Sequence, residues 1–327
     1  MDRAAELLRK SLPFRGARRI WSIFERKRKY RYAQDIWRYR FGSGSSNDKV
    51  FLVVTAGHYL KDAAWTAASW LTNSPAIAGM SLVFSVDGAA NHEEMEQIES
   101  SFPEARFVTT TQMVYEIEGR YPRLAAFAED HPLGRKLASI IAFSDLNDIV
   151  YSDSDVLLFD TPTEIQTAIC GRKAMYLQNP EPAYDQATVQ NAFNSGFEVA
   201  ERVNSGVLYA PVGFLSGEVA ELVVPLPRDV DRTSPTWWWI EQTILSVLLR
   251  AAQATPLPME RYSCSMQRQW PFEKDIDYST TCLRHFVSPV RHLMWLKGVP
   301  LLKRKFAHKW ELKQTRFREE GHTAFAG

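Results

Sequence analysis

The sequence has few cysteines and no long apolar run, and each absence excludes a class of protein. Its 327 residues include three cysteines, Cys170, Cys264 and Cys282, whose spacing matches neither a metal site nor a CxxC pair. We expect three inert, buried thiols, as in a reducing compartment. No apolar run reaches the roughly 20 residues of a spanning helix, and charges stand where a signal peptide would be apolar. We therefore expect a cytoplasmic protein that is soluble or lies on the inner face of a membrane.

Acidic and basic residues are segregated along the chain, although the formal net charge is only +1. Residues 1–50 hold 14 Lys and Arg against 5 Asp and Glu, and residues 297–327 hold 8 against 3. The region between them holds 17 against 30. An acidic body of this kind repels nucleic-acid phosphates at long range, and no nucleic-acid recognition motif is present. We therefore expect no nucleic-acid partner.

Strand and helix patterns alternate after a flexible "GSGSSND" break. The segments "KVFLVVTAG" and "MSLVFSVDG" are short apolar runs, as strands buried on both faces are. The segments "ARFVTT" and "DIVYSDSDVLLF" are also predicted strands. Helical spacing predicts helices in "DAAWTAASWL", "HEEMEQIESSF" and "GRKLASIIAFSDL" between them. Such alternation implies right-handed crossovers. The predicted fold class is α/β, with a mainly parallel sheet flanked by helices.

The two basic ends extend this domain, so we divide the chain into residues 1–48, 49–296 and 297–327. Residues 18–41 mix Arg and Lys with large apolar side chains, the composition of a helix that rests on an anionic membrane surface. The C-terminal tail has a similar mix. An amphipathic helix packed on the main domain explains the same pattern. We predict peripheral membrane contact through residues 1–41, with packing as the alternative.

Two carboxylates, Asp153 and Asp155, lie between the apolar runs of "DIVYSDSDVLLF". In an open α/β sheet, ligands bind at the carboxyl ends of the strands, which is where "DIVY" delivers this pair. Carboxylates this close repel each other unless a cation lies between them, and hard oxygen ligands suit Mg²⁺ or Mn²⁺. The alternative is a turn whose Asp residues cap a helix or face water, and the flanking apolar runs argue against it.

Four blocks of the sequence occur in an order that is known from one family. They are "GRKLASIIAFSDLNDIVYSDSDVLLF", "VNSGVLYAP", "EQTILSVLL" and "RHFVSPVRHLMW". Together they resemble the signature blocks of nucleotide-sugar-dependent glycosyltransferases with the GT-A (Rossmann-like) fold. Within that group the resemblance is to glycosyltransferase family 8, the glycogenin-like and lipopolysaccharide sugar transferases.

This resemblance implies a metal-dependent transfer of a hexose from a nucleotide diphosphate sugar, here a UDP-sugar, to a glycan or glycolipid acceptor. The reaction would retain the anomeric configuration. Asp153 and Asp155 would hold Mn²⁺ or Mg²⁺ against the donor phosphates, and the ion would neutralise the leaving diphosphate. The third ligand that the resemblance implies is His285 of the last block. Its competitor is His292, which occupies the place of the family's Pro.

The resemblance also assigns contacts to the donor, each with a structural alternative. Lys136 would contact phosphate or sugar, or be a solvated helix cation. Asp87 would bond the uracil or ribose, or form a turn, and the "NSG" segment would bind the sugar or form a tight turn. The run "TWWWI" is either core or a platform on which an acceptor sugar stacks. The full set is Thr55, Ala56, Tyr59 and Asp87 for the nucleotide, Lys136, Ser154 and Gly206 for phosphates and sugar, and Asn204, Glu241 and Gln242 near the reacting sugar.

Departures from the family pattern leave the donor sugar and the subfamily open. Glu241 replaces an Asp, Ser288 a Gly, and Arg291 and His292 a Lys and a Pro. Two other functions also stay open. A sugar nucleotidyltransferase would use acids on a similar sheet, but "TAGHYLKDAA" lacks the Gly-rich basic loop expected after its first strand. A catalytically inactive carbohydrate- or nucleotide-binding relative would carry the same motifs.

Overall fold

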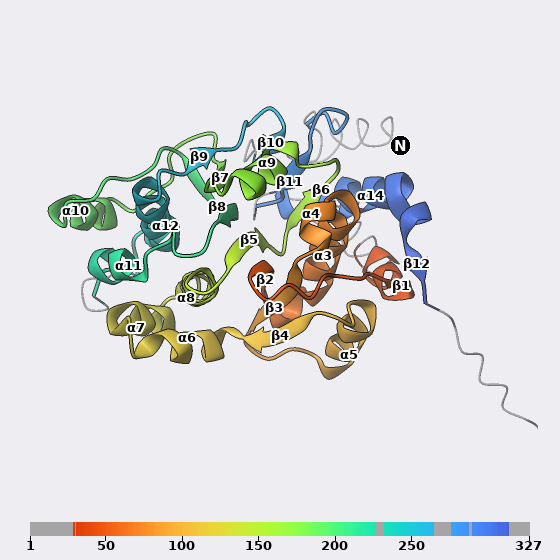
Figure 1. The fold of residues 1–327 in the computed structure, drawn as a ribbon, viewed down its shortest axis with the longest axis horizontal. Coiled ribbons are helices and arrows are strands. Elements are labelled where there is room, and N and C mark those ends of the chain that lie inside the picture. Colours follow the sequence, from red (N-terminus) through yellow and green to blue (C-terminus); the bar gives the residue numbers. More distant parts are fainter. Residues whose placement is uncertain (1–28, 30, 227–231, 265–275, 288–289, 314–327) are drawn as a thin grey trace, which may run out of the picture.

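A seven-stranded sheet forms the centre of the computed structural model, which describes residues 29, 31–226, 232–264, 276–287 and 290–313 (Figure 1). Its strand order is β4-β3-β2-β5-β8-β7-β9, and β8 is the strand that runs antiparallel to its neighbours. The strands are β2 (Lys49–Ala56), β3 (Ser81–Asp87), β4 (Arg106–Thr109), β5 (Asp148–Asp153), β7 (Met175–Gln178), β8 (Val203–Ala210) and β9 (Thr255–Pro256). The predicted α/β class with a mainly parallel sheet is confirmed.

The inner strands are buried along most of their length because both faces of the sheet are covered. In β2, Phe51 and Val53 enter the core on one face and Val50 and Leu52 enter the core on the other, as the two-residue period of a strand requires. Helices α3, α5 and α14 pack on the first face, and α6, α7, α8, α11 and α12 pack on the second. This sandwich explains the unbroken apolar runs of the sequence.

The helices predicted from spacing fall where expected, in α3, α5 and α8. Asn91 caps the start of helix α5, because its side chain accepts hydrogen bonds from Glu93 N and Glu94 N, and a capping box of Thr109 and Gln112 starts α6. The bounds are α3 (Leu60–Asn73), α4 (Pro75–Ala78), α5 (His92–Ser101), α6 (Thr110–Glu118), α7 (Pro122–Asp130), α8 (Gly134–Ser144), α9 (Thr163–Gly171), α10 (Gln186–Asn194), α11 (Gly217–Val223), α12 (Ile240–Ala251), α13 (Arg291–Leu293) and α14 (Val299–Phe306).

A small second sheet places the C-terminal part of the chain, with His285, beside the end of β5. The predicted strand "DIVYSDSDVLLF" is two strands, β5 and β6 (Val156–Leu158), with a break between them. Strand β6 pairs antiparallel with β11 (Leu283–His285), which pairs parallel with β10 (Tyr262–Ser263). In this register His285 lies opposite Val156, next to the Asp pair.

The described parts of the basic ends pack on the main body. Strand β1 (Tyr39–Arg40) pairs antiparallel with β12 (Glu311–Leu312), and the ring of Phe41 stacks on Phe102 with centroids 5.1 Å apart. Residues 31–41 therefore fit the packing alternative. The membrane prediction otherwise falls on residues 1–28 and 30, outside the described residues. Within the described ranges, no helix has the length and apolar character to cross a membrane.

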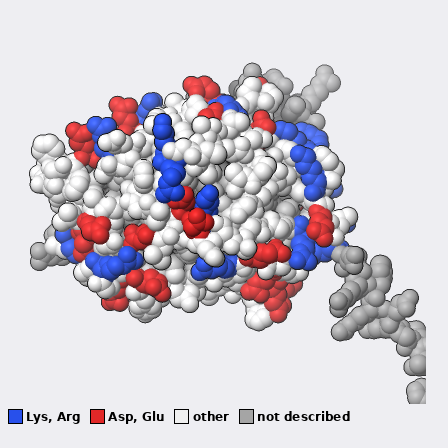
Figure 2. All heavy atoms as spheres, in the orientation of Figure 1, with Lys and Arg blue, Asp and Glu red and all other residues white. Residues whose placement is uncertain are grey.

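Charge stays segregated on the folded surface. Figure 2 shows basic side chains gathered over α14, where Lys303, Arg304 and Lys305 lie, and acidic side chains over α5, where Glu93 and Glu94 lie. The thiols differ from the expectation in one respect, because Cys170 is exposed while Cys264 and Cys282 are buried.

Candidate metal and donor site

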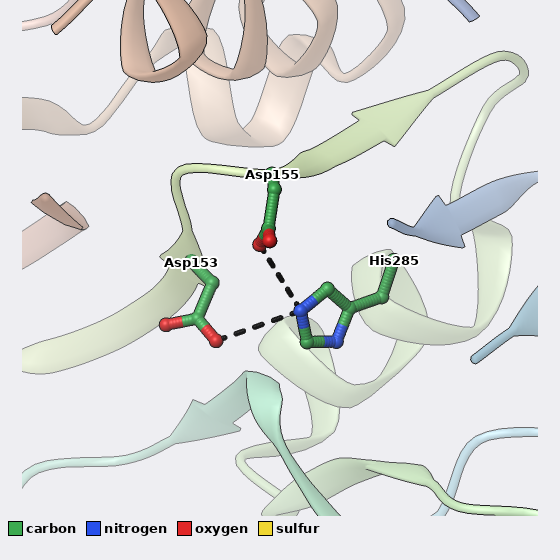
Figure 3. Close-up of side chains that lie close together, drawn as sticks. All are labelled: Asp153, Asp155 and His285. Atoms are coloured by element: carbon green, nitrogen blue, oxygen red, sulfur yellow. Dashed lines mark ion pairs between the residues drawn. The ribbon is translucent and has the colours of Figure 1, made fainter. Parts of the chain in front are cut away.

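Three side chains with metal-ligand chemistry converge at the carboxyl end of β5 (Figure 3). Asp153 is the last residue of β5, Asp155 lies in the link to β6, and His285 ends β11. Nε2 of His285 is 3.1 Å from Oδ1 of Asp155 and 3.6 Å from Oδ2 of Asp153. One ligand atom from each residue lies within 4.8 Å of the others. Two carboxylates and an imidazole could hold a divalent metal ion at this point.

His285 is oriented by Asn204, on β8. Its Nδ1 lies 2.8 Å from Oδ1 of Asn204, an oxygen that also accepts a hydrogen bond from Gly206 N at 2.9 Å. An imidazole that donates from Nδ1 presents Nε2 to the two carboxylates, the arrangement that a histidine ligand needs. Burial opposes the charged imidazolium, but the adjacent Asp155 carboxylate outweighs it and raises the pKa of His285 to about 10.

The amide of Asn204 is fully used inside the protein. Besides the two bonds to its oxygen, its Nδ2 donates to Oδ1 of Asn179 at 2.8 Å and to Sγ of Cys264 at 3.0 Å. The sequence assigned this amide to sugar hydroxyls, whereas the structure places it behind the imidazole. The tight-turn alternative for "NSG" is wrong, because all three residues lie within β8.

Gly206 makes room for the imidazole. A Cβ at this position would lie 2.3 Å from Nδ1 and Cε1 of His285, closer than any real contact. The space beside Gly206, a residue that the resemblance assigned to phosphates and sugar, is thus filled by the His285 ring.

A buried ion pair adjoins the metal-ligand cluster. Nζ of Lys136, on α8, lies 3.0 Å from Oδ1 of Asp153 and 3.5 Å from Oε1 of Glu241, on α12. Ser205 joins the pair, since its hydroxyl lies 3.1 Å from Lys136 Nζ and donates to Glu241 Oε2 at 3.0 Å. Lys136 is buried, so the solvated-cation alternative is wrong. Oε1 of Glu241 is buried with no hydrogen-bond partner among the described residues.

The surroundings decide how these groups titrate. Burial raises the pKa of the Glu241 carboxyl. Burial opposes the charged form of Lys136, but the carboxylates of Asp153 and Glu241 raise its pKa overall. Tyr151 holds Asp153 from within β5, because its hydroxyl donates to Oδ1 of that carboxylate. Lys136 therefore stays a cation among acids, which suits a phosphate contact.

Gln242 fixes the start of α12 to β8. Its Oε1 accepts from Ser205 N at 3.2 Å and its Nε2 donates to Ala183 O at 2.8 Å. Before it, Trp237–Trp239 form a short 3₁₀ helix. Trp237 packs on His131 with ring centroids 4.5 Å apart, whereas Trp238 and Trp239 are 53% and 38% exposed.

Arg291 lies beside the cluster, next to Asp155. Its guanidinium contacts Oδ2 of Asp62, on α3, at 3.1 Å, approaches Oδ2 of Asp155 at 3.6 Å, and lies 3.7 Å from the ring centroid of Tyr59. It also donates to the Ser154 hydroxyl at 3.3 Å. Two residues predicted to contact the donor, Ser154 and Tyr59, are thus gathered around Arg291.

The other predicted nucleotide residues lie at the same edge of the sheet. Ala56 pairs with Asp87 across β2 and β3, while Val54 of β2 pairs with Asp153. Asp87 is held by Thr110 Oγ1 at 2.7 Å and by Arg135 Nη1 at 3.0 Å. The side chain of Thr55 is buried, and its hydroxyl bonds to Ala56 O.

Several residues of this site were missed from the sequence. Asp62 was not predicted as a site residue, although an acid in an apolar helix, between Leu60 and Ala63, indicates a buried carboxylate with a charged partner. Ser205, Tyr151 and Asn179 carried no such signal. His292 lies on α13, outside the group of metal-ligating side chains found in the described part of the chain.

Comparison with known proteins gives only a distant likeness of fold. No family model matches the sequence, and no curated protein matches it. Mouse xyloside xylosyltransferase 1, in its apo form, is similar at 12% identity and a TM-score of 0.46, over 74% of this chain and 99% of that chain. The apo bifunctional glycosyltransferase WbbM is similar at 10% identity and a TM-score of 0.44, over 82% of this chain and 53% of that chain. These values are too low to establish a family, so the function is inferred from the chain's own residues.

Proposed function

We propose that the protein is a metal-dependent glycosyltransferase that moves a hexose from a UDP-sugar to a glycan or glycolipid acceptor, with retention of configuration. The observation that carries the proposal is the Asp153, Asp155 and His285 cluster, which lies at the carboxyl end of β5 beside the buried pair of Lys136 and Glu241. Acids and cations gathered at this edge of a parallel sheet form the kind of site in which phosphate-bearing ligands bind.

The chain's residues divide into metal, phosphate and sugar contacts. Asp153, Asp155 and His285 would hold the divalent ion, and the imidazole favours Mn²⁺ over Mg²⁺. A bound ion would draw negative charge from the leaving diphosphate. Lys136, beside Asp153, and Arg291, beside Asp155, would contact phosphate oxygens as fixed donors.

Glu241 would act on the donor sugar. Its Oε1 has no hydrogen-bond partner among the described residues, and its other oxygen is held by Ser205. A buried carboxylate beside the anomeric centre stabilises the positive charge that develops there as the diphosphate leaves. Burial raises the pKa of this carboxyl, and the adjacent Lys136 ammonium opposes that rise, since a nearby opposite charge favours the charged form.

The nucleotide and the acceptor would lie on opposite sides of this centre. Thr55, Ala56, Tyr59 and Asp87, at the ends of β2 and β3, would receive the uridine. The exposed Trp238 and Trp239 stand just before Glu241 and offer aromatic faces on which an acceptor sugar stacks.

Release of UDP from UDP-sugars, measured with and without Mn²⁺, tests the proposal. We expect Mn²⁺-dependent release by the wild type and loss of nearly all of it in D155N. The matched control is D160N, which changes an exposed acid five positions further along the chain. Binding of UDP without any turnover would support an inactive relative. Release of pyrophosphate from UTP and a sugar phosphate would support a nucleotidyltransferase.

A further inference from the structure

A lysine from the segment before the main domain lies against the donor site. Nζ of Lys29 is 3.3 Å from Oδ1 of Asp62, the carboxylate whose other oxygen contacts Arg291. Asp62 is fully buried, and its carboxylate forms an ion pair with each of the two cations. Both also lie over the ring of Tyr59, Arg291 at 3.7 Å from its centroid and Lys29 at 5.5 Å. One buried acid therefore holds two cations side by side, and one of them approaches Asp155.

Lys29 adds a positive charge to a network that is rich in acids. The network comprises four acidic side chains, Asp62, Asp153, Asp155 and Glu241, and three cations, Lys29, Lys136 and Arg291. Each of these cations attracts an incoming diphosphate, and Lys29 is the one that comes from outside residues 49–296.

We propose that Lys29 is a diphosphate-binding residue of the donor site, an inference that rests on the proposed function. The Lys29 side chain is 34% exposed and carries three N–H donors, so it can hold Asp62 and a phosphate oxygen together. The segment that carries Lys29 lies outside the predicted glycosyltransferase domain. Lys29 would thus give that domain a phosphate contact in addition to those of Lys136 and Arg291.

Binding of inorganic pyrophosphate to the full-length protein in the presence of Mn²⁺ tests the inference, because this probe contains no base and no sugar. Titration calorimetry should show about tenfold weaker pyrophosphate binding for K29Q, the expected loss of one charge-assisted contact. K29R should retain most of the affinity. R31Q removes an exposed arginine of the same segment and should bind pyrophosphate as the wild type does. Affinity for Mn²⁺ alone should be equal in all four proteins.

A structural role for Lys29 gives different results. If Lys29 only neutralises Asp62, K29Q will unfold at a lower temperature while its affinity for pyrophosphate stays unchanged, which would overturn the inference. An equal loss in R31Q would overturn it too, because the effect would then be one of general charge. If K29Q fails to fold, the same measurement can be made without the buried acid, by comparing K29Q/D62N with D62N. We again expect about tenfold weaker pyrophosphate binding when Lys29 is replaced. Failure of the wild type to bind Mn²⁺ or UDP would count against the proposed function itself.

Discussion

Asn204 and His285, 81 residues apart in the sequence, are joined by a hydrogen bond of 2.8 Å between Oδ1 and Nδ1. Every hydrogen-bonding position of the Asn204 amide is taken by the protein, through His285, Gly206, Asn179 and Cys264. We therefore interpret Asn204 as a positioning residue for the metal ligand, in place of the sugar contact expected from the sequence.

Replacement of Asn204 by alanine should weaken Mn²⁺ binding by a factor of about 10–100, because the imidazole loses the partner that orients it. Calorimetric titration with Mn²⁺, without any donor, measures this directly. A direct sugar contact would instead raise the KM for the donor and leave Mn²⁺ affinity intact. The matched control is N194A, in the exposed "NSG" copy at the end of α10, which should change neither quantity.

Substitution of Gly206 by alanine should displace His285, since the added Cβ would lie 2.3 Å from two atoms of its ring. We expect at least about tenfold weaker Mn²⁺ binding, together with about 1–3 kcal/mol of lost stability from overpacking. Denaturant unfolding and Mn²⁺ titration measure the two effects. G119A, at a position with open space around the Cβ, is the control. Tight Mn²⁺ binding by G206A would show that the imidazole is not a ligand.

The sequence predicted those parts of the site that depend on local pattern. Strands β2, β3 and β5 each contain an apolar run that is buried because helices cover both faces, and this signal is contained in each segment by itself. The position of Asp153 and Asp155 followed, because a parallel strand delivers its last residues to the ligand-binding edge.

Those parts of the site that depend on contacts between residues far apart in the sequence could not be predicted from local pattern. Asp62 and Arg291 meet across 229 residues, and neither segment alone indicates the other. "NSG" has the composition of a turn, and only its place between β5 and β7 makes it a strand. Burial of Lys136 likewise depends on Glu241, which reaches it from α12.

The two histidines of the last block should differ in their effect on metal dependence. H285A should lower Mn²⁺ affinity and Mn²⁺-dependent UDP release by a factor of about 10–100, because it removes one ligand from the cluster. H292A should behave as the wild type, since His292 lies outside that cluster. The measurement is an Mn²⁺ titration of UDP-sugar hydrolysis for the three proteins. The reverse pattern would show that our choice of the third ligand is wrong.

Metal binding should release a proton, because His285 must lose the proton on Nε2 before it can bind an ion. Although burial disfavours the imidazolium, the Asp155 carboxylate raises the pKa of His285 to about 10, so His285 is protonated in the metal-free protein at neutral pH. Below that pKa the proton competes with the metal. The association constant for Mn²⁺ should therefore rise about tenfold for each pH unit between pH 6 and 8.

Calorimetry at pH 7.5 in buffers of different ionisation enthalpy counts the protons released. We expect about one per Mn²⁺ bound by the wild type. H92A, which removes an exposed histidine at the start of α5, should release the same number. H285A should bind more weakly and release fewer protons, because the imidazole proton that the metal displaces in the wild type is absent. Proton release that persists undiminished in H285A, or Mn²⁺ binding that does not change with pH in the wild type, would mean that the metal does not displace the His285 proton.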